Sequence, residues 1–110
     1  MESLNKLERY ILAYLWYEYG GALYFSKGKE SAEKFLAKML TNELISERPY
    51  YYKTVVDGFV DALKRLQEYW MIQLSGYEIT LTSYGQQLAK QIEKNEYTQL
   101  KSDIAKGKLR

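Results

Sequence analysis

Apolar residues follow a helical period over residues 5–19, and they do so on two faces at once. The first stripe holds Leu4, Leu7, Ile11 and Leu15, and the second holds Tyr10, Ala13, Tyr14 and Tyr17. A helix on the surface of a globular protein needs only one such stripe. Asn5 and Glu8 form a capping-box pattern at the start of this segment, and Gly20-Gly21 supplies its end. We therefore expect a helix that is buried on more than one side, which favours a homodimer interface.

The rest of the pattern predicts three further helices and three short strands. Strands are expected over residues 22–25, 71–74 and 77–82, the last two joined by Ser75-Gly76 as a hairpin. Helices are expected over residues 29–41 and 50–69, the latter beginning at or just after Pro49. A fourth helix is headed by Ser83, with Gln86 completing a capping box. The predicted core residues are Phe35, Leu40, Phe59, Leu63, Leu66, Ile72, Ile79, Leu81 and Leu88.

The length of 110 residues fits one domain with a single modest core. Leu100 and Ile104 extend the last helical pattern after a break near Asn95, and residues 106–110 are expected to fray. Gly58, inside the third helix, is expected to allow close approach by the preceding helix. The predicted fold class is α+β, mainly α: one domain over residues 1–110, with a small antiparallel sheet and a C-terminal helix.

Composition restricts the chemistry that the chain can perform. It contains neither cysteine nor histidine, which excludes disulfides and thiolate metal sites and removes the commonest general base. There is also no Gly-rich phosphate loop and no nucleophile elbow. Asp57 and Asp61 lie four residues apart, but an exposed acidic stripe explains this spacing better than a metal site. We expect no enzyme activity, no cofactor and no metal. With no long apolar run and no signal peptide, we expect a cytoplasmic protein without a membrane segment.

Two sequence motifs frame the predicted hairpin. Residues 62–72 read Ala-Leu-Lys-Arg-Leu-Gln-Glu-Tyr-Trp-Met-Ile, and residues 81–89 read Leu-Thr-Ser-Tyr-Gly-Gln-Gln-Leu-Ala. The pair resembles the carboxy-terminal half of a winged helix-turn-helix domain of the MarR- or PadR-like kind. There a recognition helix of the form "ALxxLxxxGhI" runs into a two-stranded wing, and the chain returns as "hxLTxxGxxLA". The resemblance implies a winged helix-turn-helix fold and a small dimeric transcriptional regulator with double-stranded DNA as partner.

Charged residues near the predicted recognition helix give a divided picture. Residues 50–85 carry three basic and four acidic side chains, and the turn Ser75-Gly76 carries no Arg or Lys, although duplex binding depends on neutralised phosphates. The basic and polar residues sit mostly at the amino ends of the second and third helices. The candidate DNA-binding residues are Lys27, Lys29, Arg48, Tyr50, Tyr51, Lys53, Thr54 and Lys64.

Two functions stay open at this point. The first is a dimeric DNA-binding protein, a transcriptional regulator or a plasmid or virus accessory factor. The second is a winged helix that serves in protein–protein assembly without DNA, with the aromatic first helix and the tyrosine-rich patch as contact surfaces. The net charge of +2 is weak support for a polyanionic partner. The residues expected at the dimer interface are Tyr10, Tyr14, Tyr17, Leu100 and Ile104.

Overall fold

Helices and a small sheet follow one another in the order α1, β1, α2, α3, β2, β3, α4 and α5 in a computed structural model, which describes residues 3–110. The helices are α1 (Lys6–Tyr19), α2 (Ala32–Leu44), α3 (Tyr52–Glu68), α4 (Ser83–Lys90) and α5 (Lys94–Ala105). The strands are β1 (Ala22–Tyr24), β2 (Ile72–Leu74) and β3 (Glu78–Leu81). The fold is therefore α+β and mainly α, as the sequence predicts.

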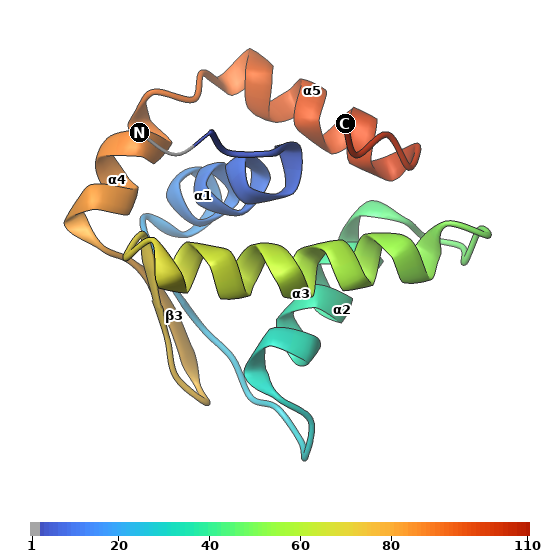
Figure 1. Cartoon of the computed structure of the whole chain (residues 1–110), viewed down its shortest axis with the longest axis horizontal. Helices are drawn as coiled ribbons and strands as arrows, with labels where there is room; N and C mark the ends of the chain where they lie inside the picture. The colour runs from blue at the N-terminus through green and yellow to red at the C-terminus, as the bar shows by residue number, and fades with distance from the viewer. Residues whose placement is uncertain (1–2) are drawn as a thin grey trace.

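The sheet is antiparallel with the strand order β1-β3-β2. Leu23 pairs with Ile79 on one side of β3, and Leu74 pairs with the same residue on the other side. Ile79 and Leu81 alternate with more exposed residues along β3, so one face of the sheet packs on the helices. The β2–β3 hairpin extends away from the helical body at the carboxyl end of α3 (Figure 1).

Helix α1 lies in the centre of the molecule, with α3 on one side, α5 on another and α4 near its carboxyl end (Figure 1). Its start is fixed by the predicted capping box: the Asn5 side chain accepts from the Glu8 amide at 2.8 Å, and Glu8 Oε1 accepts from the Asn5 amide at 2.8 Å. The other carboxylate oxygen of the buried Glu8 accepts from Arg65 Nε at 2.5 Å. This one side chain therefore caps α1 and ties it to α3.

Both apolar stripes of α1 are covered within a single chain. Residues from Tyr10 to Leu15 are at most 4% exposed, because α5 packs over the tyrosine stripe. Leu100 and Ile104 of α5 are themselves buried in the same core. The prediction that these two residues, Tyr10 and Tyr14 face a second protomer is therefore wrong, because other residues of the same chain cover their side chains. Tyr17 is partly buried, and its hydroxyl donates to the Ile92 carbonyl at 2.6 Å.

Most predicted core residues are fully buried, and the two others are partly buried. Phe35 and Leu88 are half-buried against the core. The seven fully buried ones are Leu40, Phe59, Leu63, Leu66, Ile72, Ile79 and Leu81.

Two helix starts differ from the sequence prediction. Thr82, not Ser83, caps α4, because its side chain accepts from the Gly85 amide. Ser31 caps α2, so Lys29 lies in the loop before the helix rather than at its amino end.

Two glycines permit close packing. A Cβ on Gly58 would lie 2.5 Å from Leu7 Cδ1, so the close approach that we expected comes from α1 and not from the preceding helix. A Cβ on Gly85 would collide with the backbone carbonyl of Met71. The glycine of the "LTxxGxxLA" motif thus lets α4 pack directly on the chain that enters β2.

The last residues pack rather than fray. The Tyr51 hydroxyl donates to the Ala105 carbonyl at 2.6 Å, and the Tyr51 ring lies against Gly107. Leu109 packs against the edge of the core. The apolar side chain of Leu109 and the ring of Tyr51 hold a segment whose basic composition predicts a free tail.

Candidate functional site

A groove of about 210 Å³ runs between α2 and the amino-terminal half of α3. Three segments contribute to it: α2, the loop before α3, and the first turns of α3. The lining residues are Lys34, Lys38, Asn42, Arg48, Tyr52, Lys53 and Val56. Four of them are cationic and none is acidic, so the groove concentrates positive charge that is dispersed in the sequence.

Two of the four cations are paired at the rim. Lys38 Nζ lies 2.9 Å from Glu30 Oε2, and Lys53 Nζ lies 2.7 Å from Asp57 Oδ2. The hydrogen bond from Lys53 holds the pKa of Asp57 below its usual value, so this carboxyl stays ionised. Against four cations, the two carboxylates leave a local charge of +2.

The other two cations have no carboxylate partner among the residues that the structure describes. Lys34 projects from α2 without an ion pair, and the Arg48 guanidinium stacks over the Tyr52 ring, 4.9 Å from its centroid. The Tyr52 hydroxyl lies 2.5 Å from Asn42 Oδ1, which fixes the ring beneath the guanidinium. An arginine held on an aromatic face keeps its fork of N–H donors directed outward. The groove can therefore bind an anionic group such as a phosphate.

The structure brings together some of the predicted DNA-binding residues and separates others. Arg48 and Lys53 both line the groove. Tyr50 is 98% exposed, and its ring lies edge-on to that of Tyr51 with the centroids 5.3 Å apart. Tyr51 is a wrong prediction, because it turns to the opposite side and packs on the carboxyl-terminal residues. Thr54 is exposed on that opposite side, near Lys108.

The remaining predicted cations lie outside the groove. Lys64 is exposed further along α3, and Lys29 is exposed in the loop before α2. Lys27 lies beside Gly76, in the turn of the β2–β3 hairpin. The sequence alone shows no basic residue in that turn, but the β1–α2 loop supplies one from about fifty positions earlier.

Sequence reasoning missed the contribution of α2 to the groove. Lys34, Lys38 and Asn42 are spaced by four residues, so they share one face of that helix. This spacing is a usable signal, but only the packing of α2 on α3 shows that the face looks toward Arg48 and Lys53.

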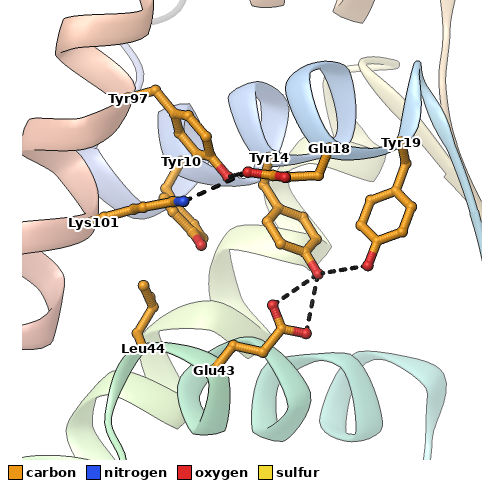
Figure 2. A pocket seen from close by; sticks show the side chains of 8 residues that line it. All are labelled: Tyr10, Tyr14, Glu18, Tyr19, Glu43, Leu44, Tyr97 and Lys101. Atoms are coloured by element: carbon orange, nitrogen blue, oxygen red, sulfur yellow. Dashed lines mark hydrogen bonds and ion pairs between the residues drawn. The ribbon is translucent and has the colours of Figure 1, made fainter.

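A second cavity, of about 260 Å³, lies between α1, α2 and α5 (Figure 2). Four tyrosines, two glutamates, a lysine and a leucine line it: Tyr10, Tyr14, Tyr19, Tyr97, Glu18, Glu43, Lys101 and Leu44. Two of these tyrosines are ones that we expected at a dimer interface. Burial, followed by their hydrogen bonds, raises the pKa of Tyr14 and of Tyr97, so both phenols stay neutral.

Three large aromatic side chains are exposed near the sheet. Tyr24, Trp70 and Tyr77 are 69%, 73% and 66% exposed. Trp70 also has a left-handed backbone, with φ of 60°, directly after α3. It occupies the position of the glycine in the "ALxxLxxxGhI" motif.

Comparison of the chain with protein-family models, curated proteins and solved structures found no match. Within residues 3–110, none of the helices has the length and apolar character needed to cross a membrane.

Proposed function

We propose that this protein binds double-stranded DNA through the groove between α2 and α3, as a winged-helix transcriptional regulator in the cytoplasm. The observation that carries the proposal is the convergence of Lys34, Lys38, Arg48 and Lys53 on one face, where Lys34 and Arg48 have no carboxylate partner within residues 3–110. Phosphate contacts supply much of the affinity of a protein for duplex DNA, and unpaired cations are the groups that make them.

The geometry supports a particular approach to the duplex. The outward face of α3 carries Asp57, Asp61 and Glu68, which would repel phosphates. The positive charge lies instead on the side that α3 shares with α2. We propose that the phosphate backbone crosses this groove, while Tyr50 and the amino end of α3 approach the base edges.

The hairpin supports the winged-helix interpretation. It follows α3 directly, its strands add to β1 in the order β1-β3-β2, and Lys27 gives its turn a positive charge. In this arrangement the hairpin is the wing. Lys27 contacts the DNA phosphate backbone beside the major groove that α3 approaches.

Salt dependence of duplex binding tests the proposal. The measurement is fluorescence anisotropy of a labelled mixed-sequence duplex, titrated at several salt concentrations. We expect the Lys34→Ala/Arg48→Ala variant to bind more weakly and to lower the salt slope by about two, since each lost phosphate contact removes about one.

The matched control is Lys106→Ala/Arg110→Ala, which removes the same charge from exposed positions outside the groove. It should keep the wild-type slope. Equal slopes for the two double variants would show that the groove is not the DNA site, and absence of wild-type binding at low salt would reject the function.

A second candidate function, protein–protein assembly, is favoured by the exposed Tyr24, Trp70 and Tyr77. Aromatic residues are enriched at interfaces because they bury much area at little entropic cost. The aromatic first helix gives this function less support, because Tyr10 and Tyr14 are at most 4% exposed. A homodimer likewise stays a prediction, and it must use surfaces other than the buried residues Tyr10 and Tyr14.

A further inference from the structure

The cavity between α1, α2 and α5 is lined mainly by tyrosines and carboxylates. Glu18 of α1 and Glu43 of α2 face it from opposite sides, and Tyr10 directs its hydroxyl into the space between them (Figure 2). The lining holds two carboxylates against one ammonium, that of Lys101. The cavity is thus an acidic and aromatic site, opposite in character to the groove between α2 and α3.

Glu43 is the carboxylate of the cavity whose charge is not compensated by a cation of the described residues. Its two oxygens lie 3.0 and 3.2 Å from the Tyr14 hydroxyl, which lies 3.4 Å from the Tyr19 hydroxyl. Tyr14 supplies a neutral hydrogen bond, and among the described residues no lysine or arginine pairs with Glu43. A carboxylate held in place by a neutral donor at the edge of a cavity is a binding point for a cation.

The chain itself places an ammonium group in the same cavity. Lys101 Nζ lies 3.5 Å from Glu18 Oε2 and 4.6 Å from the centroid of the Tyr97 ring. Tyr97 also donates to Glu18 Oε2 at 2.8 Å, which fixes that carboxylate. A primary ammonium therefore fits between a carboxylate and a tyrosine ring on the Glu18 side. The Glu43 side offers the same two kinds of group without an ammonium of its own.

The burial of the rings decides which cation fits. Tyr10, Tyr14 and Tyr97 are at most 5% exposed, so their ring faces are largely covered by one another and by the core. A quaternary ammonium depends on open ring faces, whereas a primary ammonium depends on hydrogen-bond acceptors. The volume of about 260 Å³ also falls below the roughly 300–1,000 Å³ typical of drug-sized ligands.

We propose that this cavity binds a small primary amine in its ammonium form, with the ammonium between the Glu43 carboxylate and the Tyr10 hydroxyl. The aliphatic part of the amine lies against Leu44. The site is separate from the DNA groove, so either proposal can fail without the other.

Chemical-shift mapping by NMR tests the proposal on the full chain. The probe is n-butylammonium chloride, titrated into the millimolar range, with tetramethylammonium chloride and sodium butyrate as comparison probes. We expect saturable shifts confined to amides near Glu18, Glu43 and Tyr97 with butylammonium alone. Tetramethylammonium binding equally well would overturn the assignment to a primary amine, and absence of saturable shifts would overturn the site.

Three variants locate the ammonium. Glu43→Gln keeps an acceptor for Tyr14 but removes the charge, and should weaken binding about tenfold or more, as loss of a charge-assisted hydrogen bond does. Glu47→Gln makes the same change at an exposed position outside the cavity and should bind like the wild type. Lys101→Ala removes a like charge from the cavity lining and should strengthen binding severalfold.

Each result decides the placement. Equal affinities for Glu43→Gln and Glu47→Gln would overturn it, and so would binding by Lys101→Ala that is no tighter than in the wild type. The Lys101 variant leaves the hydrogen bonds of Glu43 intact, so the placement can be judged even if Glu43→Gln folds poorly.

Discussion

The ring of Tyr97 in α5 stacks on the ring of Tyr10 in α1, with their centroids 5.6 Å apart and their planes inclined by 29°. Tyr97 also stacks on Tyr17, at 5.5 Å and 21°. One residue of the last helix therefore covers two residues of the tyrosine stripe on the first. The tyrosine face of α1 has the composition of an intermolecular interface, but α5 of the same chain covers it.

Replacement of Tyr97 measures this internal role. We expect Tyr97→Ala to lower the free energy of unfolding by about 3 kcal/mol, because it leaves a cavity beneath α5 and removes two ring contacts. Urea unfolding measures the loss, and Tyr77→Ala, at an exposed position, should cost less than about 0.5 kcal/mol.

The same experiment addresses the dimer. If these rings pack within one chain, their contact makes the unfolding midpoint of neither the wild type nor the variant depend on protein concentration. A concentration dependence that disappears in Tyr97→Ala would instead place the ring between protomers.

Three buried tyrosines predict a loss of stability at alkaline pH. Burial is the largest cause that raises the pKa of Tyr10, Tyr14 and Tyr97 above the usual value near 10. Above that pH the unfolded chain releases these protons and the folded chain keeps them, so the equilibrium moves toward unfolding. Stability that is complete below the unfolded pKa is therefore lost as pH rises toward the folded pKa.

The expected slope is up to about 1.4 kcal/mol per pH unit for each buried phenol. Urea unfolding at a series of pH values above neutrality measures it, and Tyr10→Phe should reduce it by one such contribution. A slope unchanged by Tyr10→Phe would show that this phenol ionises as easily in the folded protein as in the unfolded chain.

The helical period predicted the first four helices, because their core-facing positions are apolar at the spacing that a buried face requires. It placed Leu100 and Ile104 in an extension of the fourth helix after a break near Asn95, whereas the break falls at residues 91–93 and α5 is a separate helix. It could not say what covers the second stripe of α1. Tyr10 and Tyr97 are far apart in sequence, and an aromatic face reads the same whether a partner chain or a distant helix packs on it. The packing partner of Gly58 could not be predicted for the same reason, because Leu7 is distant from it in the sequence.

Gly85 is the position where the motif itself makes a physical prediction. We expect Gly85→Ala to destabilise the fold by about 2–3 kcal/mol, because the new Cβ meets the Met71 backbone, which cannot turn aside as a side chain can. Thermal or urea unfolding measures the change. Gly28→Ala is the control, since no atom lies within 4 Å of a Cβ there. A cost at Gly85 no larger than at Gly28 would mean that α4 moves freely away from β2.

Replacement of Trp70 by glycine should stabilise the fold, whereas replacement of Gly85 should destabilise it. Its φ of 60° suits glycine, and the Met71 amide donates to the Leu66 carbonyl at 3.0 Å across this turn. Because the ring is 73% exposed, Trp70→Gly should raise the free energy of unfolding by about 0.5–1 kcal/mol. Trp70→Ala removes the ring but keeps the strained backbone, and should bring no gain. If both variants lose stability equally, the ring contributes to folding and not to contact with a partner.

The candidate site was only half readable from the sequence. Arg48 and Lys53 lie five residues apart before and within α3, so local clustering identifies both. Tyr51 belongs to the same cluster, yet its side chain turns the other way, because a helix rotates by about 100° per residue. Lys34 and Lys38 were outside the cluster because their position in the groove depends on how α2 packs against α3.

Asp57 gives the sharpest test of how α3 meets DNA. Its carboxylate lies 2.7 Å from Lys53 Nζ, and its lowered pKa keeps it ionised near neutral pH, so it competes with a phosphate for the lysine. Asp57→Asn should therefore tighten duplex binding and steepen the salt slope by about one, as Lys53 gains a phosphate. Asp61→Asn makes the same charge change one turn along α3, where no ion pair is formed among the described residues; it should tighten binding without changing the slope. Anisotropy titrations of the two variants test this difference in salt slope. Equal slopes would mean that Lys53 does not reach the phosphates and that the phosphate contacts in the groove come from α2 alone.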